Sequence, residues 1–208
     1  MKERSLIMQM AEYQQVKDFT YEQYCDHLQA KYGIGLANYM TKSFNTNSKC
    51  QRTKDGLIAH HKKEDTTTAM LSMKVIAMRY PFDWQKRENI VYCDYLEHLL
   101  LHVLICKYPS SDEPDFVKLG INYVVDFIVP ELNDVYSGWV ARSQWRSNCY
   151  GKIINDKDVY LEILRKFIEI EKMNSDFSVD MLCESYNKPF GLWSDKKNEA
   201  IYDAIRGL

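Results

Sequence analysis

The sequence has few residues that break regular structure, and it has no paired cysteine motif. Eight glycines and five prolines among 208 residues exclude collagen-like and low-complexity chains. The six cysteines lie far apart without a C-x-x-C pair, which excludes a zinc knuckle and a dithiol redox motif. A chain of this length buries a core without disulfide or metal staples. We therefore expect a globular protein with reduced thiols.

Long apolar runs are absent as well. The longest run, residues 99–106, is interrupted by His102 and is far shorter than the roughly 20 residues that a membrane span needs. The first ten residues are charged at Lys2, Glu3 and Arg4 and show no apolar region followed by a cleavage site. These absences predict a cytoplasmic protein that does not cross a membrane.

Neither sign of charge dominates, but the charges are segregated. The formal net charge is −2. Residues 42–87 contain ten basic and four acidic side chains, whereas residues 88–137 contain two basic and nine acidic ones. This asymmetry favours a basic face for a polyanion. The alternative is two oppositely charged surfaces without such a partner.

Helical signals occupy most of the chain. Thr20 and Gln23 form a capping-box pattern before an aromatic stripe, which predicts a helix over residues 21–32 that ends at Gly33. A polar, basic loop is expected over residues 41–55. Apolar periodicity predicts further helices over residues 68–78, 116–129 and 156–172. The second of these helices is expected to end before Pro130.

Two short segments have the character of strands. Residues 56–61 are small and apolar and end in two histidines, and residues 89–93 are apolar and β-branched. Asp94 and Glu97 then form a capping pattern for a helix over residues 95–105. The predicted order is strand, long connection, strand, helix.

Four of the five histidines fall into two tight pairs. His98 and His102 are four residues apart on the predicted helix, so their Cβ atoms lie about 5–6 Å apart on one face and can share a metal ion. His60 and His61 are neighbours on a strand and point to opposite faces. One of them can complete a three-histidine metal site with open coordination positions, and the other can accept a proton from water near pH 7. His27 lies outside both pairs, and we expect it at the surface.

These residues resemble the HNH, or ββα-metal, nuclease motif. The motif has a His-His pair on the first strand, an asparagine leading the second, and a metal-binding histidine on the following helix, which correspond to His60-His61, Asn89 and His98. Asn89 precedes His98 by nine residues, as in the motif, and His102 resembles the second helical histidine of bacteriocin-type HNH DNases. The resemblance covers residues 56–105, about a quarter of the chain.

The resemblance implies a role for each of these residues. His60, His98 and His102 would bind a divalent metal ion (Mg, Mn, Zn or Ni), and His61 would be the general base. Asn89 would orient the loop or the base. The implied activity is metal-dependent endonuclease cleavage of phosphodiester bonds in DNA, with RNA as the alternative substrate, in the setting of a mobile element, phage or defence system.

The sequence departs from many family members in one respect. Asp94 and Glu97 stand where those members carry the cysteine pairs of a structural zinc site. We therefore expect flanking helices to support the core. The predicted fold is α+β and mostly helical, a single domain over residues 1–208. Its ββα-metal core spans residues 56–107, between helical segments over residues 1–50 and 110–208.

Several side chains have a predicted role in nucleic-acid binding, with a solvated basic face as the alternative. Those expected to contact phosphates are Arg52, Lys54, Lys62, Lys63 and Arg87, and the long connection adds Arg79 and Lys86. A second group is expected either to stack on unpaired bases or to lie in the core: Trp139, Arg142, Trp145 and Arg146. Glu64 and Asp65 either join a metal shell or are solvated.

Two other functions fit the same residues. A catalytically silent protein of this fold would bind nucleic acid or a protein partner without turnover. A purely structural histidine–zinc site would stabilise the chain without any nucleic-acid partner.

Overall fold

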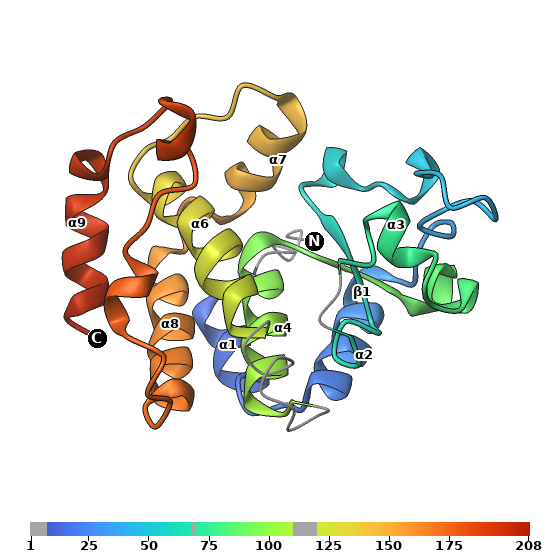
Figure 1. Cartoon of the computed structure of the whole chain (residues 1–208), viewed down its shortest axis with the longest axis horizontal. Coiled ribbons are helices and arrows are strands. Elements are labelled where there is room, and N and C mark those ends of the chain that lie inside the picture. The colour runs from blue at the N-terminus through green and yellow to red at the C-terminus, as the bar shows by residue number, and fades with distance from the viewer. Residues whose placement is uncertain (1–7, 68–69, 110–119) are drawn as a thin grey trace, which may run out of the picture.

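The computed structural model describes residues 8–67, 70–109 and 120–208. It is mostly helical with one two-stranded antiparallel sheet, as the sequence predicts for an α+β protein (Figure 1). The helices and strands are α1 (Met10–Val16), α2 (Tyr21–Tyr32), β1 (Ile58–His61), α3 (Lys74–Ala77), β2 (Ile90–Cys93), α4 (Tyr95–Lys107), α6 (Val129–Tyr136), α7 (Gln144–Ile153), α8 (Lys157–Glu171) and α9 (Asp195–Arg206).

The two strands pair in a register that places the histidine pair at the start of β2. His61 is opposite Ile90, and Ile58 is opposite Cys93. All four residues of β2 are buried, because α2 packs against this strand and the core lies behind it. The packing of β2 against α2 and the core therefore holds the sheet in place, and the end of β1 carries His60 and His61.

Helix α4 lies at the centre of the molecule, with α1 and α8 on one side and β1 and α2 on the other (Figure 1). Its predicted cap is confirmed. The Asp94 carboxylate accepts hydrogen bonds from the backbone N–H groups of Leu96 and Glu97, and the Glu97 carboxylate accepts one from the Asp94 N–H. Ten of its thirteen residues are buried, so α4 is hydrophobic all round, as a central helix should be.

The helix over residues 21–32 is also confirmed. In α2 the Thr20 hydroxyl and the Gln23 side chain form the reciprocal capping box, and Gly33 follows at φ 83°. The aromatic stripe of α2 is buried in the core. Helix α8 agrees with the prediction over residues 156–172 within one residue at each end.

Two predicted helical segments are wrong in extent. The helix expected over residues 68–78 is only α3, four residues long, and its start at 68–69 lies outside the described residues. Most side chains around it, including Met73, Val75 and Met78, are exposed, so little burial supports a longer helix. In the helical segment expected over residues 1–50, the helices described end at Tyr32, and residues 33–57 form loops with short 3₁₀ turns.

Pro130 does not end a helix, contrary to the sequence prediction. The chain is helical from residue 120 through a π-helical segment (Val124–Ile128) into α6, where Pro130 is the second residue. The Val129 N–H bonds to the carbonyl of Val124, five residues earlier. A proline ring clashes with a regular α-helical turn, and the wider π-helical turn gives it room. Residues 116–119 of the predicted helix lie outside the described residues.

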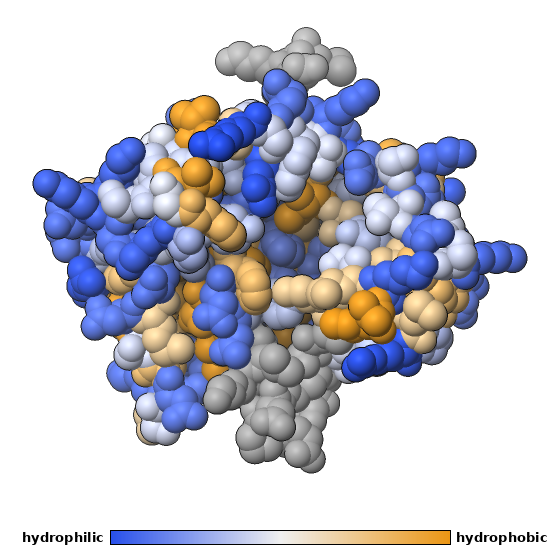
Figure 2. Space-filling view, turned by 45° about the horizontal axis from the view of Figure 1, so that its top comes forward, coloured by the Kyte–Doolittle hydropathy of each residue, from blue (hydrophilic) through white to orange (hydrophobic). Residues whose placement is uncertain are grey.

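The surface is hollowed near the middle of one face, and hydrophobic side chains border the hollow (Figure 2). None of the described helices has both the length and the apolar composition of a membrane span.

Candidate metal centre

The end of β1 directs its two histidines to different surroundings. Both His60 and His61 are buried, at 1% exposure each. His60 packs against the histidines of α4, with ring centroids 5.3 Å from His98 and 5.2 Å from His102. His61 instead contacts Tyr39, with ring centroids 4.4 Å apart. Because successive side chains of a strand point to opposite faces, the rings of His60 and His61 lie in different surroundings.

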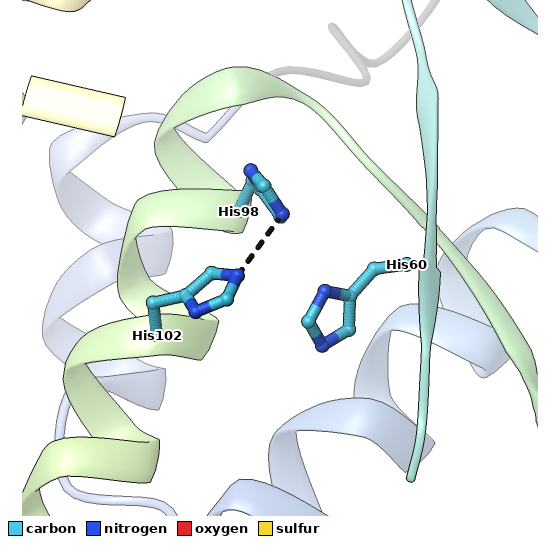
Figure 3. Close-up of side chains that lie close together, drawn as sticks. All are labelled: His60, His98 and His102. Atoms are coloured by element: carbon cyan, nitrogen blue, oxygen red, sulfur yellow. Dashed lines mark hydrogen bonds between the residues drawn. The ribbon is translucent and has the colours of Figure 1, made fainter. Parts of the chain in front are cut away.

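Three histidines from β1 and α4 converge on one point (Figure 3). One ring nitrogen from each of His60, His98 and His102 lies within 4.8 Å of the others. The Nε2 atoms of His98 and His102 are 3.2 Å apart, since four residues bring both side chains to the same face of α4. This group can hold a metal ion.

Tyr21 fixes the tautomer of His60. Its hydroxyl donates to the His61 carbonyl oxygen (3.1 Å) and lies 2.8 Å from His60 Nε2. Because the single hydroxyl hydrogen is used, the hydroxyl accepts from Nε2–H, and the lone pair of His60 is at Nδ1. A hydrogen-bonded partner behind the ring is the usual arrangement for a metal-binding histidine.

Glu64 places a carboxylate beside this lone pair. Its Oε2 atom is 3.3 Å from His60 Nδ1 and 3.7 Å from His102 Nε2, and its Oε1 atom is 3.4 Å from His61 Nδ1. A turn brings the side chain back over the strand end, because the Glu64 N–H bonds to the His61 carbonyl oxygen. Glu64 therefore touches both members of the histidine pair.

Burial keeps the converging imidazoles neutral. Desolvation holds the pKa of His60 and of His102 well below the ordinary value, and adjacent histidines lower both further. Burial lowers the pKa of His98 to about 4. Neutral imidazoles keep the lone pairs that a metal ion requires.

The residues fit a bound cation. His60 Nδ1 is buried and receives no hydrogen bond from any described group, and it faces the Glu64 carboxylate. Two acceptors at 3.3 Å repel each other unless positive charge lies near them. Three imidazoles and a carboxylate are typical ligands of zinc and similar transition ions.

His61 is arranged as a proton acceptor at one nitrogen. The Gln85 amide N–H donates to the Leu71 carbonyl, so Gln85 presents its oxygen to His61 Nε2 at 3.1 Å. Nε2 then carries the hydrogen, and the lone pair is at Nδ1, on the side of Glu64. Gln85 is fully buried, which keeps this orientation fixed.

Asn89 connects the long loop to the strand pair. Its side-chain N–H donates to the Asp83 carbonyl oxygen (2.7 Å), and its own carbonyl accepts from the Lys62 N–H (2.9 Å). The residue immediately precedes β2 and therefore joins the end of β1 to the loop at residues 82–89. It lies beside Lys62, one residue beyond the histidine pair, and the described contacts include no bond from its side chain to either histidine.

The five predicted phosphate-binding residues have different surroundings. Arg52 bonds to Asp55 and to the Tyr32 carbonyl, and Lys62 bonds to Asp26. These two side chains are engaged in the fold. The remaining three are exposed or half-buried: Lys54, Lys63 and Arg87.

The predicted aromatic group is divided between core and surface. Trp139 packs edge-on against Trp193, with ring centroids 5.3 Å apart. Trp145 is 41% exposed, with the Arg146 guanidinium over its ring. His27, expected at the surface, is half-buried and bonds to Glu12.

Sequence reasoning did not assign site roles to Tyr21 and Gln85, and it left Glu64 undecided. Tyr21 belongs to the aromatic stripe of α2, and periodicity reports only that the stripe is buried. Gln85 lies in the long connection between the strands, where the sequence shows neither apolar periodicity nor a motif. Glu64, four residues after His60, offers the one local signal, because a turn at the end of β1 brings it back to the pair.

Comparison with family models, curated proteins and solved structures finds no match to this chain. The geometry of this site is therefore the basis for inferring the function.

Proposed function

We propose that this protein is a divalent-metal-dependent endonuclease of the HNH type that hydrolyses phosphodiester bonds in DNA. One observation carries the proposal. His60, His98 and His102 converge on a cation-binding point, while His61 lies next to them on the strand with a lone pair at Nδ1. The order of elements along the chain, β1, β2 and then α4, is also that of the HNH motif: β1 supplies His60 and His61, Asn89 immediately precedes β2, and α4 supplies His98 and His102.

Each side chain has a defined task in this proposal. His60, His98, His102 and Glu64 would hold the cation, which when bound supplies Lewis-acid stabilisation of the negative charge on the phosphate and the leaving oxygen. His61 Nδ1 accepts the proton of the attacking water, and Gln85 holds the ring in the correct tautomer. Tyr21 orients His60, and Asn89 holds the loop against the strand end.

One observation favours a second function. His61 is 1% exposed, and its Nδ1 faces Glu64 at 3.4 Å, so water reaches the base only if this carboxylate moves aside. A protein in which Glu64 stays in place would bind metal and nucleic acid without turnover.

Nicking of supercoiled plasmid separates the two functions. We expect nicking by the wild-type protein with Mg²⁺, Mn²⁺, Zn²⁺ or Ni²⁺, no nicking with a chelator, and a loss of at least about 100-fold in rate for His61→Ala. His27→Ala is the matched control, because His27 lies outside the site, and should keep the wild-type rate. Metal uptake without nicking under any ion would support the silent function and contradict the proposal.

A further inference from the structure

A cavity opens directly beside the metal centre. It has a volume of about 220 Å³ and lies between β1, α4 and the π-helical segment. Six side chains matter for its chemistry: Tyr95, His98, Tyr123, Phe127, Glu131 and Tyr186. His98 belongs to both the cavity and the metal centre, so a ligand in the cavity lies next to the bound cation.

Aromatic rings form the walls of this cavity. Tyr123 stacks on His102, with centroids 4.9 Å apart and planes 13° apart, which fixes the wall relative to the metal centre. Phe127 follows one helical turn later, 5.8 Å from Tyr123, and is 44% exposed. The π-helical segment carries Phe127, and such segments frequently occur at functional sites.

Glu131 gives the cavity one acidic polar group. Its Oε1 atom accepts hydrogen bonds from the hydroxyls of Tyr95 and Tyr150 and lies 3.5 Å from Arg146 Nε. Its Oε2 atom receives no hydrogen bond from any described group. A half-buried carboxylate oxygen only accepts hydrogen bonds, so the complementary ligand group is a donor.

We propose that this cavity binds one unpaired guanine base of the substrate, adjacent to the phosphate that is cleaved. The aromatic walls suit a planar heterocycle, and base–aromatic stacking is a general mode of single-strand binding. Guanine has two neighbouring donors, N1–H and the exocyclic amino group, and both can reach the two lone pairs of Glu131 Oε2, because Oε1 already accepts from Tyr95 and Tyr150. Because a base enters only after leaving its stack, the preferred substrate is single-stranded or locally unpaired nucleic acid. This inference rests on the proposed endonuclease function.

Binding of short oligonucleotides tests the proposal without turnover. We would load the His61→Ala protein with Zn²⁺ and measure fluorescence anisotropy with a labelled six-nucleotide oligothymidine and with the same strand carrying one central guanine. We expect the guanine strand to bind about 10-fold more tightly, because only guanine donates hydrogen bonds to the Glu131 carboxylate in this pair of strands. Glu131→Gln should remove this preference while keeping the acceptor for Tyr95 and Tyr150, and Phe127→Ala should weaken binding of both strands.

A matched surface aromatic provides the control. Tyr108, at the far end of α4, is 46% exposed, close to the 44% of Phe127, so Tyr108→Ala should leave both affinities unchanged. Equal affinity of the two strands, or a guanine preference that Glu131→Gln retains, would overturn the guanine site.

The two proposals fail in different ways. A wild-type protein that cleaves both strands at equal rates, with no guanine preference in binding, would contradict the base site and leave the nuclease standing. A protein that binds the guanine strand preferentially and cleaves neither strand under any divalent ion would contradict the nuclease and leave the base site standing.

Discussion

At the scale of single residues, the site depends on hydrogen bonds behind the histidines as much as on the histidines themselves. Tyr21 sets the lone pair of His60 at Nδ1, and Gln85 sets that of His61 at Nδ1. The sequence could predict the four imidazoles from their spacing. It could not predict these partners, because a hydrogen bond between α2 and β1 depends on packing that no local pattern records.

Tyr21→Phe should lower the affinity for a divalent metal ion by about 10-fold, the effect typical of losing an orienting partner. Without the hydroxyl, His60 no longer has a fixed tautomer, and Nε2 loses its partner. Competition with a fluorescent chelator measures the change. Tyr24→Phe is the control on the same helix, because the buried Tyr24 hydroxyl has no hydrogen-bond partner among the described residues, and it should have wild-type affinity.

Glu64→Gln should also weaken metal binding, by about 10- to 100-fold. The substitution keeps the shape of the side chain but removes the negative charge beside His60 and His102. Isothermal titration with Zn²⁺ measures the affinity. Glu88→Gln removes an equivalent charge at an exposed position and should have no effect; equal affinities for Glu64→Gln and wild type would exclude Glu64 from the cation site.

At the scale of elements, local signals were sufficient where capping and burial agree. The Asp94–Glu97 box and the apolar run predict α4 closely, and the two short strand segments predict β1 and β2. Local signals failed at residues 68–78, where most of the described side chains are exposed and burial does not stabilise a helix. They also failed at Pro130, where a π-helical turn accommodates the proline ring. Both failures depend on tertiary surroundings.

Asp94→Ala should destabilise the protein by about 2 kcal/mol. The carboxylate accepts from the N–H groups of Leu96 and Glu97 and from the buried N–H of Met8, and alanine leaves all three without this partner. Urea unfolding measures the difference. Ser143→Ala, at the start of α7, is the control because the Ser143 side chain makes no cap hydrogen bond, and a similar loss there would refute the assignment.

At the scale of the whole molecule, the site is assembled from segments far apart in the chain. Helix α2, the end of β1, the long loop and α4 each contribute a side chain to the surroundings of the histidines. The HNH resemblance could predict which histidines meet, but it could not predict the cavity beside them, because Tyr123, Phe127 and Glu131 come from a region without a motif.

The metal-free protein should lose stability as the pH falls from about 6.5 towards 4. Folding lowers the pKa of His98 from 6.5 to about 4, and those of His60 and His102 also fall. As the pH falls, the unfolded chain therefore binds protons at a higher pH than the folded chain does. Each of these histidines lowers the free energy of unfolding by up to about 1.4 kcal/mol per pH unit in this window. Thermal unfolding in chelator between pH 7 and 5 measures the slope. His98→Asn should reduce it, and an unchanged slope would contradict buried neutral imidazoles.

Titration of the protein with Co²⁺, followed by the visible d–d absorption of the ion, shows whether His60, His98 and His102 bind one divalent cation. We expect bands that saturate at one ion per chain, disappear in His98→Ala and persist in His27→Ala. Absence of bands in the wild type, or equal bands in His98→Ala, would contradict binding of the cation at these histidines.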